Sequence, residues 1–263
     1  MNYHANDRAS AEELLRQGDN YYRNGKYPQA LESYMKADQA HPGNPEVYNL
    51  IGMTYTMLGH YPQSVAYFRK VLRIDPNNIF ALYNMSLAYS GQGHYPQAIQ
   101  ALQKILQCRP DNAAAYNGLG RVYEDQGRLD DAVEAYRTAV KIKQDFDIAY
   151  YNLGNVYDTM GLYDKAIRAY QQAIKINPDK AARAYNNLGN VYFNRDENDE
   201  AINAYRQAAQ IDPYDVMAHI NIGHVYSKLH DYKRAAEAYD AALRIDPYCA
   251  EADEFLQLTR TMM

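Results

Sequence analysis

The chain has 263 residues, of which 47% are hydrophobic and 22% are charged, as in an ordinary folded protein. Its 27 Lys and Arg residues against 32 Asp and Glu give a net charge of -5, which argues against nucleic acid as a partner because phosphate binding relies on clustered positive charge. No stretch is long and apolar enough to span a bilayer, so we also expect no membrane insertion.

The first nine residues are polar and lack the basic start and apolar run of a secretory signal. Ser10 and Glu13 have the spacing of a capping box, the residue pair that satisfies free backbone groups where a helix begins. We therefore expect residues 1–9 to be a disordered tail and the fold to begin at residue 10. The default location of such a chain is the cytoplasm.

A short pattern, a small residue followed three positions later by Tyr, recurs along the rest of the chain. The step is 34 residues except for one of 35, and the small residues are Gly18, Gly52, Ser86, Gly120, Gly154, Gly189 and Gly223. A second series keeps the same steps: Ala30, Ser64, Ala98, Ala132, Ala166, Ala201 and Ala235. The chain is therefore built of repeats. Its 28 Tyr against 5 Phe and no Trp indicate that phenol rings fill a recurring aromatic position.

Each repeat is expected to hold two helices, which we name helix A and helix B. In the fifth repeat one helical face is formed by Tyr150, Leu153, Gly154 and Tyr157, and a second by Ala166, Tyr170 and Ala173. Between them, Gly161 stands where helix A must end in a left-handed cap, and in the last two repeats Asp196 and His230 take that place. Helix B ends before a proline in most repeats, because proline disfavours helical geometry in the residue before it.

These residues resemble the tetratricopeptide-repeat (TPR) family, whose unit has this length and a related pattern. The resemblance implies an all-α, right-handed superhelical solenoid of about seven helix-turn-helix units. The units are 11–44, 45–78, 79–112, 113–146, 147–180, 182–215 and 216–249. Residues 250–263 read as a C-terminal capping helix. Gln144 replaces the expected proline, so we expect the junction after the fourth unit to pack differently.

We expect no enzyme activity, cofactor or metal site. The sequence shows no nucleophile, base and orienting group whose roles it can support. Its seven histidines include no pair at metal-ligand spacing.

In the TPR family the A helices line a concave groove, and asparagine recurs at the corresponding positions here. Similar asparagine ladders in the repeat region of O-linked N-acetylglucosamine transferases hold the backbone of an extended peptide. An amide suits this task because it both donates and accepts hydrogen bonds. Asparagine is also a mediocre helix former, which argues against a purely solubilising role. The candidate residues are Asn84, Asn117, Asn152, Asn155, Asn187, Asn190 and Asn221.

The second and third repeats carry apolar residues at the corresponding positions: Met53, Met57, Phe80, Tyr83 and Leu87. The core stripe of these two repeats is already filled by other residues, so we expect this set to be exposed and to bind a partner.

The function expected from these features is that of a non-enzymatic adaptor or scaffold, which binds a protein or peptide segment in the groove. Two alternatives remain. The chain is a structural unit that self-associates into homo-oligomers, or it is a regulatory or substrate-recruiting partner of a separate enzyme.

Overall fold

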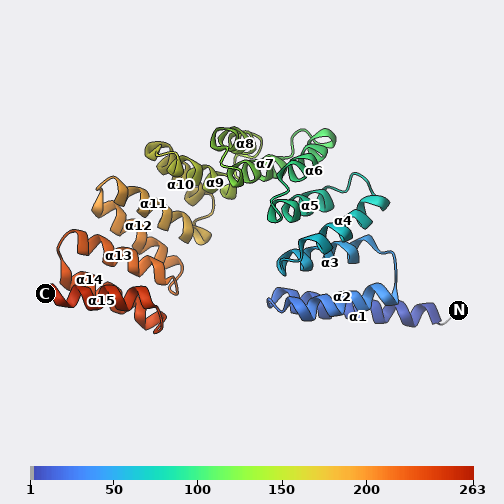
Figure 1. Cartoon of the computed structure of the whole chain (residues 1–263), viewed down its shortest axis with the longest axis horizontal. Coiled ribbons are helices and arrows are strands. Elements are labelled where there is room, and N and C mark those ends of the chain that lie inside the picture. Colours follow the sequence, from blue (N-terminus) through green and yellow to red (C-terminus); the bar gives the residue numbers. More distant parts are fainter. Residues whose placement is uncertain (1–2) are drawn as a thin grey trace. The chain divides into compact units, whose positions relative to one another are not determined.

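The computed structural model describes residues 3–263, which form α-helices joined by short turns and contain no strand (Figure 1). One 3-10 turn, Pro178–Lys180, accompanies the single 35-residue step. The helices are α1 (Tyr3–Arg23), α2 (Tyr27–Ala40), α3 (Pro45–Met57), α4 (Tyr61–Ile74), α5 (Ile79–Gly91), α6 (Tyr95–Cys108), α7 (Ala113–Asp125), α8 (Leu129–Ile142), α9 (Asp147–Thr159), α10 (Tyr163–Ile176), α11 (Ala182–Asn194), α12 (Asn198–Ile211), α13 (Val216–Lys228), α14 (Tyr232–Ile245) and α15 (Ala250–Thr261).

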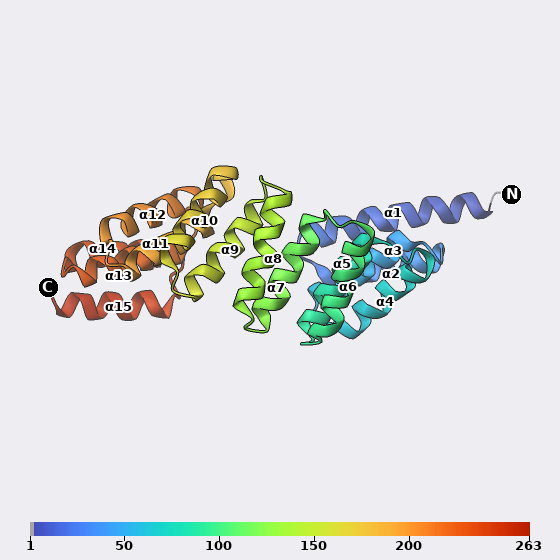
Figure 2. The same ribbon diagram turned by 90° about the horizontal axis from the view of Figure 1, so that it is seen from above.

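The chain divides into two compact blocks, an N-terminal block that ends at Ile142 and a C-terminal block, Lys143–Met263. The division falls next to Gln144, where the expected proline is missing. In each block the odd-numbered helices are the A helices and the even-numbered ones are the B helices. Figure 2 shows the A helices α9, α11 and α13 on one side of the C-terminal block and the B helices α10, α12 and α14 on the other.

Helix α1 differs from the expectation for the N-terminus. It begins at Tyr3, so residues 3–9 are helical rather than the disordered tail that we expected, and Ser10 lies within the helix. No Gly or Pro occurs between Tyr3 and Ser10, so no residue in this stretch interrupts helical geometry. Residues 1 and 2 of the expected tail lie outside the described residues.

The turns between helix A and helix B adopt the predicted left-handed geometry. Gly161 has a φ of 70°, and Asp196 and His230 have φ values of 63° and 59°. Asp196 and His230 are the only non-glycine residues with positive φ in the described part of the chain. Because a side chain clashes with the backbone in this region, both turns carry strain that the glycine turns avoid.

Each glycine in the series of small residues of helix A lies against a large side chain of helix B in the same repeat. A Cβ atom added to Gly154 would lie 2.6 Å from the ring of Tyr170, and one added to Gly189 would lie 2.5 Å from the ring of Tyr205. The pattern therefore lets the two backbones approach and buries one large side chain between them. The fully buried tyrosines of this kind are Tyr34, Tyr136, Tyr170, Tyr205 and Tyr239.

Helix α15 closes the C-terminal block. Leu256 is 3% exposed, and Phe255 packs against the buried cluster that includes Val225 and Tyr239. Leu258, on the opposite face, is 51% exposed. One face of α15 thus covers the preceding repeat while the other faces solvent. None of the described helices combines the length and apolar character that crossing a bilayer requires.

Candidate partner-binding surfaces

The C-terminal block carries five of the predicted asparagines on three successive A helices. Asn152 and Asn155 lie on α9, Asn187 and Asn190 on α11, and Asn221 on α13. All five are half-buried, as expected for side chains at the rim of packed helices. We call these five residues the amide surface.

Two residues of the amide surface accept hydrogen bonds from buried tyrosines of helix B. Tyr170 donates its hydroxyl hydrogen to Asn155 Oδ1 at 2.8 Å. Tyr205 donates to Asn190 Oδ1 at the same distance, one repeat later. Because each tyrosine ring is fixed in the core, its hydroxyl orients the amide above it.

Asn187 connects two repeats. Its Nδ2 donates to Asn155 Oδ1 at 2.9 Å and to the hydroxyl of Tyr151 at 3.2 Å, so it links α11 to α9. Asn221 makes no side-chain hydrogen bond to another described residue, whereas Asn152 does take part in an interaction. The amide surface is therefore partly a structural network.

The hydroxyl of the buried tyrosine finds a partner in the other repeats as well. In the first repeat Tyr34 donates to Asp19 Oδ1 at 2.7 Å. In the fourth, Arg121 follows the small residue, and Tyr136 donates instead to Glu124 Oε2 at 2.8 Å. Burial raises the pKa of Tyr136 and also raises the pKa of Glu124.

The second and third repeats have no hydroxyl at this position. Their equivalent residues in helix B are Phe68 and Leu102, both fully buried. The residue after the small position is then apolar, Met53 in one repeat and Leu87 in the other. The two positions therefore change together. This pairing is visible in the printed sequence at a constant separation, but only the structure shows that Met53 packs against the cluster of Phe68.

The predicted apolar set is exposed only in part. Met57 is 50% and Phe80 is 48% exposed, whereas Met53, Tyr83 and Leu87 are half-buried. Met53 packs against the cluster of Phe68, and Tyr83 packs against the cluster of Leu102. The expectation that the whole set is exposed was therefore wrong: the core extends to Met53 and Tyr83, and Leu87 is also half-buried.

A hollow opens beside Leu87 on the N-terminal block. Its lining residues include Gly91, Gly118, Arg121 and Asp125. Ser90 donates to Asp125 Oδ2 at 2.7 Å across the hollow, from α5 to α7. Leu87 thus has one face open to this hollow.

The two remaining asparagines are already engaged. Asn84 Nδ2 donates to the backbone oxygen of Phe80 at 2.9 Å, one helical turn earlier. Asn117 is only 4% exposed and takes part in an interaction within the fold. A direct contact between Asn117 and a partner therefore conflicts with its burial.

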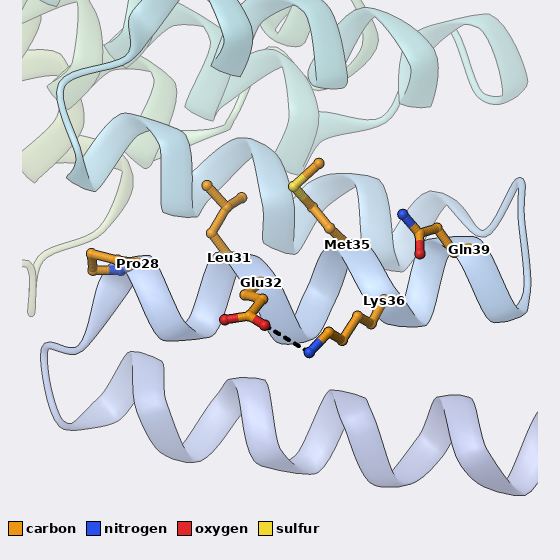
Figure 3. Close-up of a pocket in the computed structure, with 6 residues that line it drawn as sticks. All are labelled: Pro28, Leu31, Glu32, Met35, Lys36 and Gln39. Atoms are coloured by element: carbon orange, nitrogen blue, oxygen red, sulfur yellow. Dashed lines mark hydrogen bonds and ion pairs between the residues drawn. The ribbon is translucent and has the colours of Figure 1, made fainter.

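A second hollow lies on helix B of the first repeat, away from these residues (Figure 3). All of its lining side chains come from α2, and they include Met35 and the ion pair between Lys36 Nζ and Glu32 Oε1 at 2.7 Å. One helix alone forms a shallow surface, so we assign no site to it. The described residues include no cluster of His, Cys, Asp and Glu that could hold a metal ion.

Family comparisons agree with the repeat pattern. Tetratricopeptide-repeat models match residues 45–78, 83–145, 148–180, 169–203 and 216–249, and a TPR-repeat model matches 18–59 and 189–230. The chain belongs to the tetratricopeptide-repeat family. TPR proteins generally act as non-catalytic scaffolds for protein-protein interaction. No curated protein matches this TPR chain.

Solved TPR structures share the fold. A tetratricopeptide repeat protein from Parabacteroides merdae is 19% identical with a TM-score of 0.65, and the match covers 96% of this chain and 99% of that one. MamA is 32% identical with a TM-score of 0.53 over 62% of this chain and 95% of its own. YrrB, a TPR protein with an unusual peptide-binding site, is 23% identical with a TM-score of 0.57 over 71% of this chain and 96% of its own.

Proposed function

We propose that this TPR chain is an adaptor that binds an extended segment of another protein on the A-helix side of its C-terminal block. The observation that carries the proposal is the amide surface, five asparagines on three successive A helices. Amides suit a peptide backbone, since each offers donors and an acceptor. At about 0.5–1.5 kcal/mol net per hydrogen bond, a few such contacts hold a backbone without selecting its sequence.

The apolar residues of the N-terminal block form a second, separate candidate surface for a partner. Met57 and Phe80 are about half exposed, and Leu87 borders the hollow. A large apolar side chain of the partner that is buried here would contribute about 1.5–3 kcal/mol. Methionine adapts its shape to different partners, so this surface suits several related side chains.

The first test replaces Asn152, Asn187 and Asn221 together with Ala. Peptides selected from a phage-displayed random library on the unmodified protein serve as probes. We expect the triple variant to bind them at least tenfold more weakly while its helicity by circular dichroism changes little. Unchanged affinity would exclude Asn152, Asn187 and Asn221 as contacts of the peptide and would contradict the proposal.

A matched control is available on the B helices of the same three repeats. Gln172, Asn203 and Glu237 are exposed polar residues of α10, α12 and α14. Their triple replacement with Ala should leave peptide affinity unchanged. A similar loss in both triple variants would mean that the effect is on folding rather than on binding.

Self-association is the second candidate function, and the exposure of Met57 and Phe80 favours it. Light scattering over a range of protein concentrations measures the oligomeric state. If the chain assembles through this surface, Met57→Glu with Phe80→Glu abolishes concentration-dependent oligomers. Met217→Glu is the control, since Met217 is 47% exposed but lies in the other block. A monomer at all concentrations would exclude this function.

A further inference from the structure

The amide of Asn155 has a defined orientation. Its oxygen accepts from the hydroxyl of Tyr170 at 2.8 Å and from Asn187 Nδ2 at 2.9 Å. A carboxamide oxygen has two acceptor positions, so these two bonds use both of them. The Nδ2 hydrogens of Asn155 remain, and they have no partner among the described residues.

Asn190 is held in the same way one repeat later. Tyr205 donates to its Oδ1 at 2.8 Å, and the Tyr205 ring is only 2% exposed. Burial raises the pKa of Tyr205, so the hydroxyl keeps its hydrogen at neutral pH and acts as the donor. The oxygen of Asn190 therefore faces the core, and its Nδ2 faces away from it.

Asn187, between these two, is oriented in the opposite sense. Its Nδ2 uses its hydrogens on Asn155 Oδ1 and on the hydroxyl of Tyr151. The oxygen of Asn187 is the group that remains for a ligand. Toward a ligand, Asn155 therefore offers a donor, Asn187 an acceptor and Asn190 a donor.

We infer that the buried tyrosines Tyr170 and Tyr205 fix Asn155 and Asn190 as hydrogen-bond donors toward backbone carbonyl oxygens of an extended peptide. Asn187 accepts from a backbone N–H of the same peptide. Only an extended segment offers free carbonyls and free N–H groups in alternation, since a helix uses both internally. This inference rests on the proposed function and assigns the side-chain atoms that contact the peptide backbone.

The orientation is testable without any ligand. Hydrogen exchange of the asparagine side-chain amides can be followed in nitrogen-15 NMR spectra of the full chain. We expect fast exchange for Asn155 and Asn190 and slower exchange for Asn187, whose hydrogens are bonded. Slow exchange of Asn155 together with fast exchange of Asn187 would overturn the assignment.

Isosteric substitution tests the role in binding. Asn155→Asp and Asn190→Asp keep an oxygen to accept from Tyr170 and Tyr205 but remove the outward N–H donors. With the phage-selected peptides as probes, we expect each variant to lose about tenfold or more in affinity. The control for the added charge is Asn203→Asp, an exposed position on the B helix α12 that should bind as the unmodified protein does.

Removing the tyrosine hydroxyl tests its positioning role. Tyr205→Phe leaves Asn190 in place but releases its oxygen, so we expect a severalfold loss of affinity and a change in the Asn190 amide signals. Tyr136→Phe is the matched control, because Tyr136 donates to Glu124 and not to the amide surface. If the two variants lose the same amount of peptide affinity, the Tyr205 hydroxyl has only a structural role and the inference is wrong.

The outcomes separate the two proposals. If no peptide binds the unmodified protein, the proposed function is wrong and this inference falls with it. If peptides bind but Asn155→Asp and Asn190→Asp behave like Asn203→Asp, the function stands and the donor assignment is wrong.

Discussion

In the second repeat Met53 packs against the cluster of Phe68. Asn155 has the equivalent position in the fifth repeat, where it accepts a hydrogen bond from the hydroxyl of Tyr170. In each case the residue after the small position of helix A matches the chemistry of the buried side chain in helix B. In the fifth repeat the buried hydroxyl is accompanied by an acceptor, and in the second the buried ring is accompanied by an apolar side chain. The fourth repeat differs, because Tyr136 donates to Glu124. In the second and fifth repeats the buried side chain of helix B thus restricts which residue type suits the adjacent position of helix A.

Phe68→Tyr should destabilise the protein by about 1–3 kcal/mol, because the new hydroxyl is buried beside Met53 without an acceptor. Adding Met53→Asn supplies the acceptor and should recover most of the loss. A double-mutant cycle from urea denaturation measures the coupling between the two positions. Additive effects of the two substitutions would contradict the pairing.

His230→Gly should stabilise the last repeat by about 0.5–1 kcal/mol, since it removes a side chain from a left-handed turn. The gain is reduced by loss of the 2.9 Å hydrogen bond between His230 Nδ1 and the Tyr232 hydroxyl. Gly161→Ala is the converse control and should destabilise by about 1 kcal/mol, because its φ is 70° although no atom lies within 4 Å of the added Cβ. Thermal unfolding measures both changes, and loss of stability in His230→Gly would contradict the strain argument.

Leu256→Ala should release helix α15 from the last repeat. Leu256 is 3% exposed, and truncating a buried leucine costs about 2–5 kcal/mol. Hydrogen exchange of α14 and α15 amides should then be much faster than in the unmodified protein. Leu258→Ala, at 51% exposure on the same helix, should change stability by no more than about 0.5 kcal/mol. Similar exchange in the two variants would mean that α15 does not cap the array.

Acid should weaken the C-terminal repeats. Burial lowers the pKa of His224, although the negative charge of Glu251 acts in the opposite direction. Burial likewise lowers the pKa of His219. His224 Nε2 is buried without a hydrogen-bond partner, and its ring contacts Phe255 of the capping helix at a centroid distance of 4.6 Å. The unfolded chain therefore binds more protons than the folded one below about pH 6.5, so stability falls as the pH decreases through that range.

The measurement is the urea midpoint of the C-terminal repeats at pH 7.5 and 5.5. Replacing His224 with Gln should reduce the difference between the two values. His41→Gln, at an exposed position in the N-terminal block, is the control and should leave the difference unchanged. If the urea midpoint depends on pH as strongly after both His224 and His219 are replaced, these histidines are not the cause of the pH dependence.

Much of the fold follows from local patterns in the sequence. Turns such as those at Gly161, Asp196 and His230 were predictable because the backbone geometry of a short segment depends on a few neighbouring residues. The same holds for the helical faces around Gly154 and Gly189. The start of α1 was less predictable, since the capping pair at Ser10 marks a helix start only when the residues before it leave the helix.

The tertiary structure alone decided which surface residues are already bonded. In the sequence, Asn155, Asn187 and Asn190 are all expected to be exposed polar residues of the groove, and Met53 is a surface methionine. The structure shows that Tyr170 and Asn187 occupy the oxygen of Asn155, and that Met53 belongs to the cluster of Phe68. Hydrogen bonds between helices depend on how the helices pack, which no single segment encodes. The sequence by itself therefore determined the repeat, its turns and the residue types on its surface, and the packing of helix A on helix B decided which of their atoms remain for a partner.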